Sequence, residues 1–426
     1  MSHVLEDLKT FLDTSPTSWH ATKQIGNRLA LHDYTPLQES EKWNLEKGKK
    51  YFVHRGGSFC AFHLPSHDLE KAFILAAHTD SPALKIKPHP ESKKENMTLF
   101  GVEVYGSPIL NSWLNRDLCI AGRVVVADSA GNIEQKLVTM DDVAICIPQL
   151  ALHLDREVNE KGLQLNKQEH LPPLICLDKD SDGTLETLLR RHLAFHTLLS
   201  FDLFVVPMET ARFLGASNEM LASYRIDNLV SVHAAITALA MQQDIPQTTL
   251  PMTIFWDHEE IGSKTLEGAD SSFVSDIFSR LYAFYHKKAE EQAICKSKSL
   301  CLSLDMAHAL HPSFPKKHDP NHQPLLGKGI VIKYNADYKY ATSALSSAPI
   351  VQLCRENNIA YQQFVARSDM PSGSTVGPIF SRQMGMNTVD IGCPQLSMHA
   401  ARELIACQDH VDLCMLLAHG LKKFST

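Results

Sequence analysis

The sequence predicts an α/β fold in which a mixed, largely parallel sheet is flanked by helices and interrupted by an inserted β-rich domain. Three observations predict this. Short apolar runs, of which residues 71–77 are the clearest, are typical of strands buried on both faces. Segments with helical spacing of apolar side chains, such as residues 228–242, alternate with these runs. Between about residues 91 and 214 the apolar runs become shorter and the loops more polar, which indicates an insertion.

The individual elements follow from the same patterns. Helical spacing predicts helices at residues 4–12, 19–30 and 228–242. Apolar runs predict strands at residues 50–62, 71–77, 122–127, 135–140, 252–256, 300–304 and 388–391. Ser18 is a candidate N-cap of the second helix, and Gly56 with Gly57 divides the first apolar run into a hairpin.

The chain of 426 residues is long enough for two or three domains. We expect a discontinuous α/β domain, with its first part in residues 1–90 and its second part in residues 219–426. Residues 91–218 then form the inserted domain, which contains the shorter strand-like runs.

The charge is mildly acidic and evenly spread. Lys and Arg number 41 and Asp and Glu number 48, which gives a net charge of −7. Because there is no basic stripe, we expect neither nucleic acid nor an anionic membrane as a partner. The longest apolar runs fall far short of the ~20 residues that span a bilayer. Ten cysteines without a CxxC pair, and an N-terminus without a signal-peptide pattern, indicate a cytoplasmic protein with reduced thiols.

Two segments with ionisable side chains follow predicted strands. His78 and Asp80 stand at a strand end, where the first could bind a ligand and the second could orient it, although a strand-end histidine is often structural. Residues 257–260 (DHEE) crowd three acids together, as either a solvated loop or a cation site. Glu259 and Glu260 are adjacent and cannot point the same way, so one could bind a metal while the other acts as a general base.

Three further groups complete a possible metal site. Asp227 precedes the apolar helix, where an aspartate is by default an N-cap, and Asp305 and His399 follow predicted strands. Each has a structural alternative when taken alone. Together with His78 and one of the two glutamates, Glu259 or Glu260, they form the set that a pair of zinc ions needs. One carboxylate bridges the metals, and each metal takes one histidine and one further carboxylate.

Other common catalytic signatures are missing from the sequence. The single-zinc signature HExxH is absent, and the nearest look-alike, HLAFH at residues 192–196, lacks the glutamate. The motifs GxSxG, Walker A and GxGxxG are absent as well. The simplest serine hydrolases, nucleotide triphosphatases and dinucleotide-binding enzymes are therefore excluded.

Ordered motifs along the whole chain resemble those of a known family. They are AAHTDSP at 76–82, LNRDL at 114–118, IPQLALHLDR at 147–156, DNL at 227–229, DHEEIGS at 257–263, SLDMAHALHP at 303–312 and PQLSMHAARE at 394–403. With these motifs, the sequence resembles the aspartyl aminopeptidase family of metallopeptidases. The resemblance implies a discontinuous α/β metallopeptidase domain with an inserted β-rich dimerisation domain, assembled into a tetrahedral homododecamer.

The resemblance also implies two zinc ions per subunit, in positions that Mn²⁺ or Co²⁺ would also suit. His78, Asp227 and Asp305 would hold one ion, and Asp227, Glu260 and His399 the other. Glu259 would be the general base, and Asp80 would orient His78 through its second ring nitrogen.

The implied substrates are peptides with an N-terminal Asp or Glu. Lys333, with Tyr340 near it in the motif, matches the lysine that binds the acidic side chain in the family. From the residues alone, Lys333 could equally be an exposed strand lysine, and Lys339 is a competitor. His308 matches a histidine that contacts substrate, and Gly373 lies in a segment like the family's substrate-lining glycine loop.

His153 lies in the insert, and the family uses this histidine in a neighbouring subunit's active site; a structural histidine is the alternative. Two other functions stay open. One is a broader aminopeptidase, or an amidase of the same superfamily, with the same metals. The other is a non-catalytic assembly protein, which predicts lost catalytic groups, whereas every candidate ligand and Glu259 are present.

Overall fold

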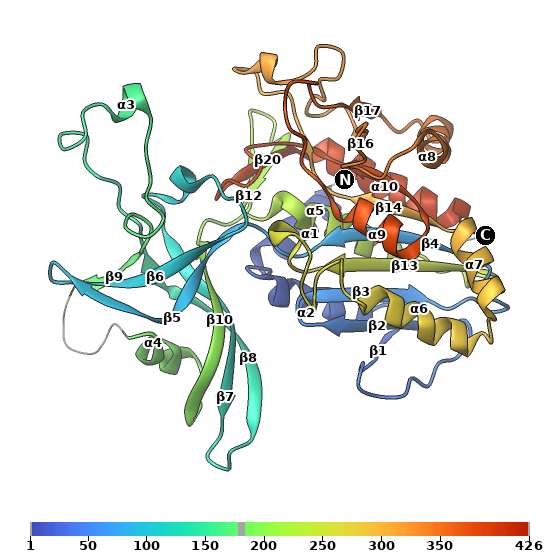
Figure 1. The fold of residues 1–426 in the computed structure, drawn as a ribbon, viewed down its shortest axis with the longest axis horizontal. Coiled ribbons are helices and arrows are strands. Elements are labelled where there is room, and N and C mark those ends of the chain that lie inside the picture. The colour runs from blue at the N-terminus through green and yellow to red at the C-terminus, as the bar shows by residue number, and fades with distance from the viewer. Residues whose placement is uncertain (1, 178–183, 425–426) are drawn as a thin grey trace.

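Two lobes make up the structure, a computed structural model that describes residues 2–177 and 184–424 (Figure 1). One lobe is an α/β layered structure built from the N-terminal and C-terminal parts of the chain. The other is rich in strands and comes from the middle of the sequence. The predicted α/β fold with an inserted β-rich domain is therefore confirmed.

The α/β lobe contains a nine-stranded mixed sheet in the order β1-β2-β3-β13-β4-β14-β18-β16-β17. Its strands are β1 (Tyr34–Pro36), β2 (Lys50–Arg55), β3 (Ser58–His63), β4 (Lys71–His78), β13 (Thr249–Trp256), β14 (Leu300–Leu304), β16 (Ile330–Lys333), β17 (Tyr361–Phe364) and β18 (Asn387–Gly392). The central strands β13, β4, β14 and β18 are parallel to one another. Their carboxyl ends therefore meet at one edge of the sheet.

Helices cover both faces of this sheet. One face carries α1 (Ser2–Asp13), α2 (Ser18–Ala30), α5 (Ile226–Ala240), α8 (Ala344–Glu356) and α10 (Cys407–Phe424), and the other carries α6 (Phe273–Phe284), α7 (Ala289–Lys298) and α9 (Val376–Met384). Within the described part of the chain, no helix has both the length and the apolar composition needed to cross a bilayer.

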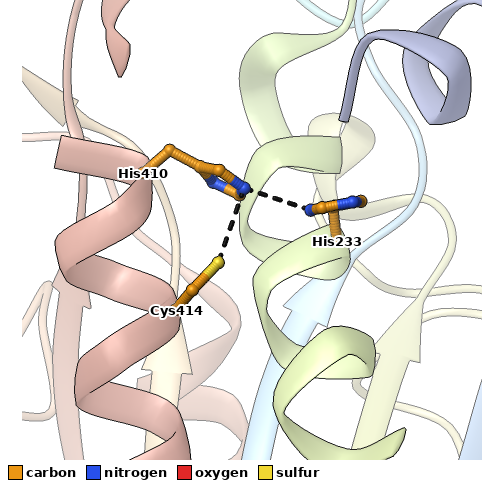
Figure 2. Close-up of side chains that lie close together, drawn as sticks. All are labelled: His233, His410 and Cys414. Carbon is orange, nitrogen blue, oxygen red and sulfur yellow. Dashed lines mark hydrogen bonds between the residues drawn. The ribbon is translucent and has the colours of Figure 1, made fainter. Parts of the chain in front are cut away.

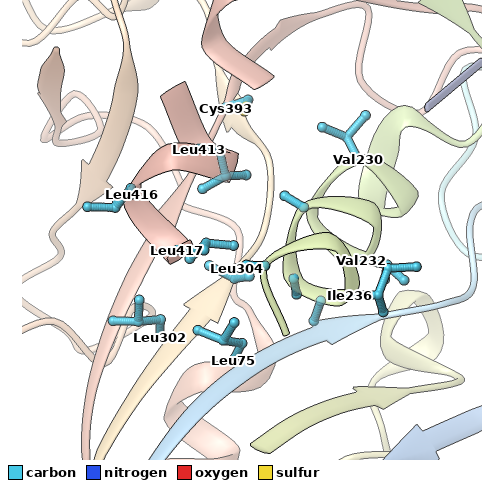
Figure 3. Close-up of a cluster of buried hydrophobic side chains, with 14 of the residues drawn as sticks. Leu75, Val230, Val232, Ile236, Leu302, Leu304, Cys393, Leu413, Leu416 and Leu417 are labelled. Carbon is cyan, nitrogen blue, oxygen red and sulfur yellow. The ribbon is translucent and has the colours of Figure 1, made fainter. Parts of the chain in front are cut away.

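The continuous apolar run of β4 is explained by burial on both faces. Leu75 and Ala77 pack into the core beneath α5 and α10, while Ile74 and Ala76 pack into the core beneath α6 and α9. Figure 3 shows Leu75 beside side chains of β14, α5 and α10. Because successive strand residues point to opposite faces, a strand covered on both sides needs apolar residues throughout.

The strand-rich lobe contains a six-stranded antiparallel sheet in the order β8-β7-β10-β5-β6-β9. Its elements are β5 (Ala83–Lys94), β6 (Met97–Tyr105), the 3-10 helix η1 (Leu110–Trp113), β7 (Leu118–Ala127), β8 (Ile133–Ile145), α3 (Val158–Lys161), β9 (Leu174–Leu177), α4 (Leu185–His192) and β10 (Thr197–Pro207). The sheet thus uses residues 83–207, whereas the predicted insert is 91–218. The division of the chain at 90 and 218 stays a prediction.

A third sheet is built from segments that follow the six-stranded sheet in the sequence. Its order is β11-β12-β20-β19-β15, from β11 (Arg212–Leu214), β12 (Met220–Ser223), β20 (Glu403–Ala406), β19 (Pro394–Leu396) and β15 (Ala307–His308). Because β12 leads into α5 and β20 follows the loop containing His399, this sheet brings the start of α5 close to that loop.

The helix boundary at Ser18 differs from the prediction. Ser18 is the first residue of α2, and Thr17 occupies the N-cap position. The Ser18 hydroxyl instead donates a hydrogen bond of 2.8 Å to the buried carboxylate of Asp257. The polar side chain therefore serves a tertiary contact that local spacing does not reveal.

Candidate metal centre

Carboxylates and histidines gather where the central parallel strands end. His78 ends β4, residues 257–260 follow β13, and Asp305 follows β14. Asp227 lies in the first turn of α5, and His399 lies in the loop between β19 and β20. In open α/β sheets, this edge is where ligands bind.

Asp227 lies between two histidines. Its Oδ1 is 3.3 Å from His78 Nε2, and its Oδ2 is 3.6 Å from His399 Nε2. Asp305 Oδ1 lies 3.8 Å from His78 Nε2, and Glu260 Oε1 lies 3.4 Å from His399 Nε2. The five side chains thus form two groups of three, which share Asp227.

Several features of these groups fit metal ions. Asp227 Oδ1 and Glu260 Oε1 are buried and have no hydrogen-bond partner among the described residues. Ligand atoms of His78, Asp227 and Glu260 all lie within 4.8 Å of one another. Tetrahedral zinc with bonds of about 2.0–2.1 Å separates neighbouring ligand atoms by about 3.3 Å. The separations between these side chains are close to that value.

The electrostatic field at this point favours a cation. Burial by itself lowers the pKa of His78, but the carboxylates of Asp227, Asp305 and Asp80 outweigh it and raise that pKa well above its usual value. Burial, together with nearby Asp227, raises the pKa of Glu260 well above its usual value, although His399 opposes this. A metal ion can replace the protons that these groups otherwise attract.

The start of α5 is shaped to turn Asp227 toward the histidines. Asp227 has non-helical dihedrals (φ −81°, ψ 107°), and the peptide bond that joins it to Asn228 is cis. Asn228 Nδ2 donates to the Leu304 carbonyl at 2.7 Å, and the Ser81 hydroxyl donates to the Asp227 carbonyl at 2.5 Å. The carboxylate makes no helix-capping hydrogen bond, so the N-cap alternative for Asp227 is wrong.

Asp80 connects His78 with the pair of glutamates. The carboxylate lies 3.4 Å from His78 Nδ1, and the Asp80 carbonyl accepts a hydrogen bond of 3.0 Å from the same nitrogen. The carboxylate also accepts hydrogen bonds of 3.1 Å from the backbone N–H groups of Glu259 and Glu260. Its contacts therefore extend beyond the histidine that the sequence suggested.

Glu259 lies in the short 3-10 helix η2 (Glu259–Ile261) beside the two groups. Burial raises the pKa of its carboxyl, His78 lowers it, and Asp305, Asp80 and Asp227 raise it further, to about 8. The left-handed conformation of His258 (φ 64°) turns the chain sharply into η2. As a result, Glu260 faces His399, whereas its neighbour Glu259 is left free to act as an acid or a base.

Two residues of the centre were not identified from the sequence. Glu403 accepts a hydrogen bond of 2.9 Å from the Asp227 N–H and one of 2.7 Å from the His399 N–H. Tyr105, at the end of β6, donates a hydrogen bond of 2.7 Å to Asp80. An acid four residues after His399 was a weak local signal for Glu403. No local pattern identifies Tyr105 as a residue of the centre, because β6 is distant in sequence from the strand end that carries Asp80.

Lys333 is buried beside the centre, so the alternative of an exposed strand lysine is wrong. It is 2% exposed, and its Nζ donates to the Met306 carbonyl at 3.0 Å. The same atom lies 3.5 Å from Asp305 Oδ2 and 5.1 Å from the ring centroid of the buried Tyr340. Lys339, the other candidate for binding an acidic side chain, is exposed on the loop that follows β16.

The remaining candidate substrate-binding residues are more exposed to solvent than Lys333. His308, in β15, and Gly373, in a loop before α9, are exposed, and a Cβ at Gly373 would meet open space. His153 lies in an exposed turn just before α3, in the strand-rich lobe (Figure 1). Within this single chain, the structure does not bring His153 to the centre.

Comparisons with known proteins agree with this geometry. The family model described as Aminopeptidase I zinc metalloprotease (M18) matches residues 11–419. A probable M18 family aminopeptidase 2 of Streptomyces avermitilis is 40% identical over 427 residues, which cover 98% of this chain and 96% of the relative.

Solved structures share the whole fold. The cryo-electron microscopy structure of the Ape4 and Nbr1 complex matches with a TM-score of 0.94 at 31% identity, over 100% of this chain and 86% of that chain. The structure of the S. cerevisiae mApe1 dodecamer matches with a TM-score of 0.85 at 24% identity, over 100% of this chain and 98% of that one. The family match over nearly the whole chain, together with the metal-binding geometry, shows that this protein belongs to the M18 family of zinc metallo-aminopeptidases.

Proposed function

We propose that this aminopeptidase removes N-terminal Asp and Glu residues from peptides, with a pair of zinc ions at the centre. The main support for this proposal is the buried Lys333 ammonium, whose Nζ lies 3.5 Å from Oδ2 of the candidate ligand Asp305. A cation in this position complements an acidic substrate side chain. The motifs shared with the aspartyl aminopeptidase family support the same specificity.

In this proposal, His78, Asp227 and Asp305 hold one zinc ion, and Asp227, Glu260 and His399 hold the other. When bound, the zinc pair supplies Lewis-acid polarisation of the scissile carbonyl and increases the acidity of water. Asp80 holds the His78 ring in place and fixes the turn that carries both glutamates.

Glu259 performs the proton transfers. Its carboxylate accepts a proton from the attacking water and then donates that proton to the leaving amine, so the group is regenerated after each cycle. A carboxyl that lies beside the metal ligands, and is not itself one of them, can carry out both steps.

Lys333 selects the acidic side chain. An ammonium group has three donors, and the Met306 carbonyl accepts one of them. The remaining donors can bind a substrate carboxylate, with the Tyr340 ring fixing the lysine from one side. His308 and Gly373, which match substrate-contacting positions of the family, complete the proposed substrate site.

The direct test is hydrolysis of peptides with N-terminal Asp, Glu, Leu or Lys by the zinc-loaded full chain. We expect wild type to prefer Asp and Glu, Glu259→Gln to retain its zinc and lose about 10³-fold or more in kcat, and Lys333→Met to lose the acidic preference. Lys339→Met is the matched control and should behave as wild type.

Each contrary result of the peptide test has a defined meaning. Equal cleavage of all four peptides by wild type would favour the broader aminopeptidase or amidase. No cleavage by a chain whose candidate metal centre holds both zinc ions would favour the non-catalytic assembly protein.

We also propose that the subunits form a tetrahedral homododecamer from dimers joined by the inserted domain, residues 91–218, in the cytoplasm. A related structure is that of a dodecamer, and the exposed His153 and its leucine neighbours lie on the inserted lobe. His153 would then reach the active site of the neighbouring subunit and stabilise the transition state.

The assembly proposal predicts the effect of His153→Ala. We expect the oligomer, measured by light scattering, and the zinc content to be unchanged, while kcat/KM falls about 10²-fold, as for the loss of one transition-state donor. His170→Ala, at an exposed histidine of the same lobe, is the control. A monomer with full activity would contradict this proposal.

A further inference from the structure

A second group of side chains that could hold a metal ion lies between helices of the α/β lobe, away from the strand ends. It comprises His233 on α5 and His410 and Cys414 on α10, which we name the His-His-Cys cluster (Figure 2). His233 Nδ1 is 3.1 Å from His410 Nε2, and Cys414 Sγ is 3.5 Å from that same nitrogen. All three atoms lie within 4.8 Å of one another.

These separations match those of ligands around one zinc ion. With Zn–N bonds of about 2.05 Å, a Zn–S bond of about 2.3 Å and tetrahedral angles, two nitrogens lie about 3.3 Å apart, and a nitrogen and a sulfur about 3.6 Å apart. The cluster has 3.1 and 3.5 Å for the same two separations. An ion could therefore bind with only small side-chain shifts.

His233 is held in the tautomer that a metal ligand requires. Its Nε2 lies 3.0 Å from Asp7 Oδ2, on α1, and Asp7 forms an ion pair of 2.6 Å with Arg28. Because the Asp7 carboxylate accepts the Nε2 proton, Nδ1 directs its lone pair into the cluster. Histidines that bind metals almost always donate their other ring nitrogen to such a carboxylate or carbonyl.

The surroundings keep both imidazoles neutral, and in the metal-bound form the His410 proton would lie on Nδ1, which is buried and has no hydrogen-bond partner among the described residues. His233 and His410 are fully buried, and burial lowers the pKa of each. Cys414 lies one helical turn after His410, on the same face of α10, and is partly exposed. Burial raises the pKa of its thiol to about 12, so the thiol keeps its proton unless a metal displaces it.

We propose that the His-His-Cys cluster binds one Zn²⁺ ion, separate from the candidate metal centre. On binding, the Cys414 S–H bond breaks, a zinc–sulfur bond forms, and the thiol proton passes to solvent. The His410 proton moves from Nε2 to Nδ1, so that the Nε2 lone pair binds the ion. Water completes the coordination on the partly exposed side. The ion joins α10 to α5, and α5 carries Asp227 in its first turn, so the site stabilises the element that supports the centre.

The alternative without an ion is a chain of hydrogen bonds from His410 through His233 to Asp7. Cobalt distinguishes the two arrangements, because a cobalt–thiolate bond produces an intense near-ultraviolet charge-transfer band that imidazole and carboxylate ligands do not. The candidate metal centre contains no sulfur ligand. A thiolate band that is lost when the cluster is altered therefore reports on the cluster, whether or not the protein cleaves peptides.

The experiment titrates the metal-free full chain with Co²⁺ in wild type, Cys414→Ser and His410→Asn. Cys176→Ser is the matched control, at a half-buried cysteine of β9. We expect the band in wild type and Cys176→Ser and its loss in both cluster variants. Zinc-loaded samples should contain one zinc ion fewer per chain in these two variants, by elemental mass spectrometry.

Two results would overturn the proposal: a wild-type spectrum without the thiolate band at saturating cobalt, or a band that survives in the cluster variants. Circular dichroism establishes that each variant is folded. If Cys414→Ser fails to fold, the band of His410→Asn, which keeps the thiol, decides the question.

Discussion

Asp227 connects the two groups of ligands in the candidate metal centre. Its carboxylate lies between His78 and His399, its carbonyl accepts a hydrogen bond from Ser81, and its N–H donates to Glu403. A carboxylate with an open oxygen toward each histidine is what a bridging ligand requires. The local sequence around Asp227 resembles an ordinary helix start, so its position depends on contacts made after folding.

Glu403 is expected to control how tightly the centre holds zinc. Its two oxygens accept the N–H groups of Asp227 and His399, one candidate ligand each. Glu403→Gln replaces one of these acceptors by a donor. We expect zinc affinity to fall about 10- to 100-fold, as for other groups that orient metal ligands. Competition with a chelator measures this affinity.

The control for this experiment is Glu160→Gln, at an exposed position of α3. It should bind zinc as wild type does. If Glu403→Gln also binds zinc with unchanged affinity, Glu403 has no part in orienting the ligands, and its buried hydrogen bonds serve only the loop.

Among the secondary-structure elements, the strands could be predicted from the sequence, and with them the site residues that follow the strand ends. Apolar runs identified β4, β13 and β14, and parallel strands place the residues after them at one edge. His78, Glu260 and Asp305 were therefore expected near one another from local patterns and a general rule. The family resemblance supplied the pairing of these groups around two ions.

The parts that could not be predicted depend on tertiary contacts. Tyr105 reaches Asp80 from the strand-rich lobe, and no periodicity in β6 indicates this contact. Lys333 has the local pattern of an exposed strand residue, but β16 lies between β18 and β17 and the lysine is buried. Whether a charged group is buried depends on which side chains pack against it. The spacing of residues in the sequence does not show these tertiary contacts.

The hairpin of β2 and β3 contains a group that should make stability depend on pH. His63 is buried in β3, its Nε2–H donates to the Gly48 carbonyl at 3.2 Å, and burial lowers its pKa to about 4. The folded-state pKa lies below the unfolded value of about 6.5, so the unfolded state binds the proton more tightly. The contribution of His63 is complete above pH ~6.5 and is lost as the pH falls toward about 4.

We expect His63→Gln, which can keep the bond to Gly48 and does not titrate, to lose less stability than wild type between about pH 7.5 and about pH 5. The difference should be at most about 2 kcal/mol. Thermal unfolding at both pH values measures it, with His67→Gln, at an exposed histidine, as the control. Parallel pH profiles for wild type and His63→Gln would show that His63 is not the responsible group.

At the scale of the whole molecule, the candidate metal centre needs both lobes. Tyr105 donates to Asp80, and the Ser107 carbonyl lies 3.1 Å from His399 Nδ1, so residues of the strand-rich lobe and its exit support ligands of the α/β lobe. Separation of the lobes would remove contacts from both groups of ligands. The proposed assembly adds His153 of a neighbouring subunit to the same site.

An anomalous difference map, recorded at the zinc edge from crystals of the zinc-loaded protein, would locate the ions of the candidate metal centre directly. The proposed zinc pair predicts two neighbouring peaks at the strand ends, one bound by His78 and Asp305, the other by Glu260 and His399, with Asp227 bound to both. A single peak there, or zinc held without Asp227 between the two positions, would contradict it.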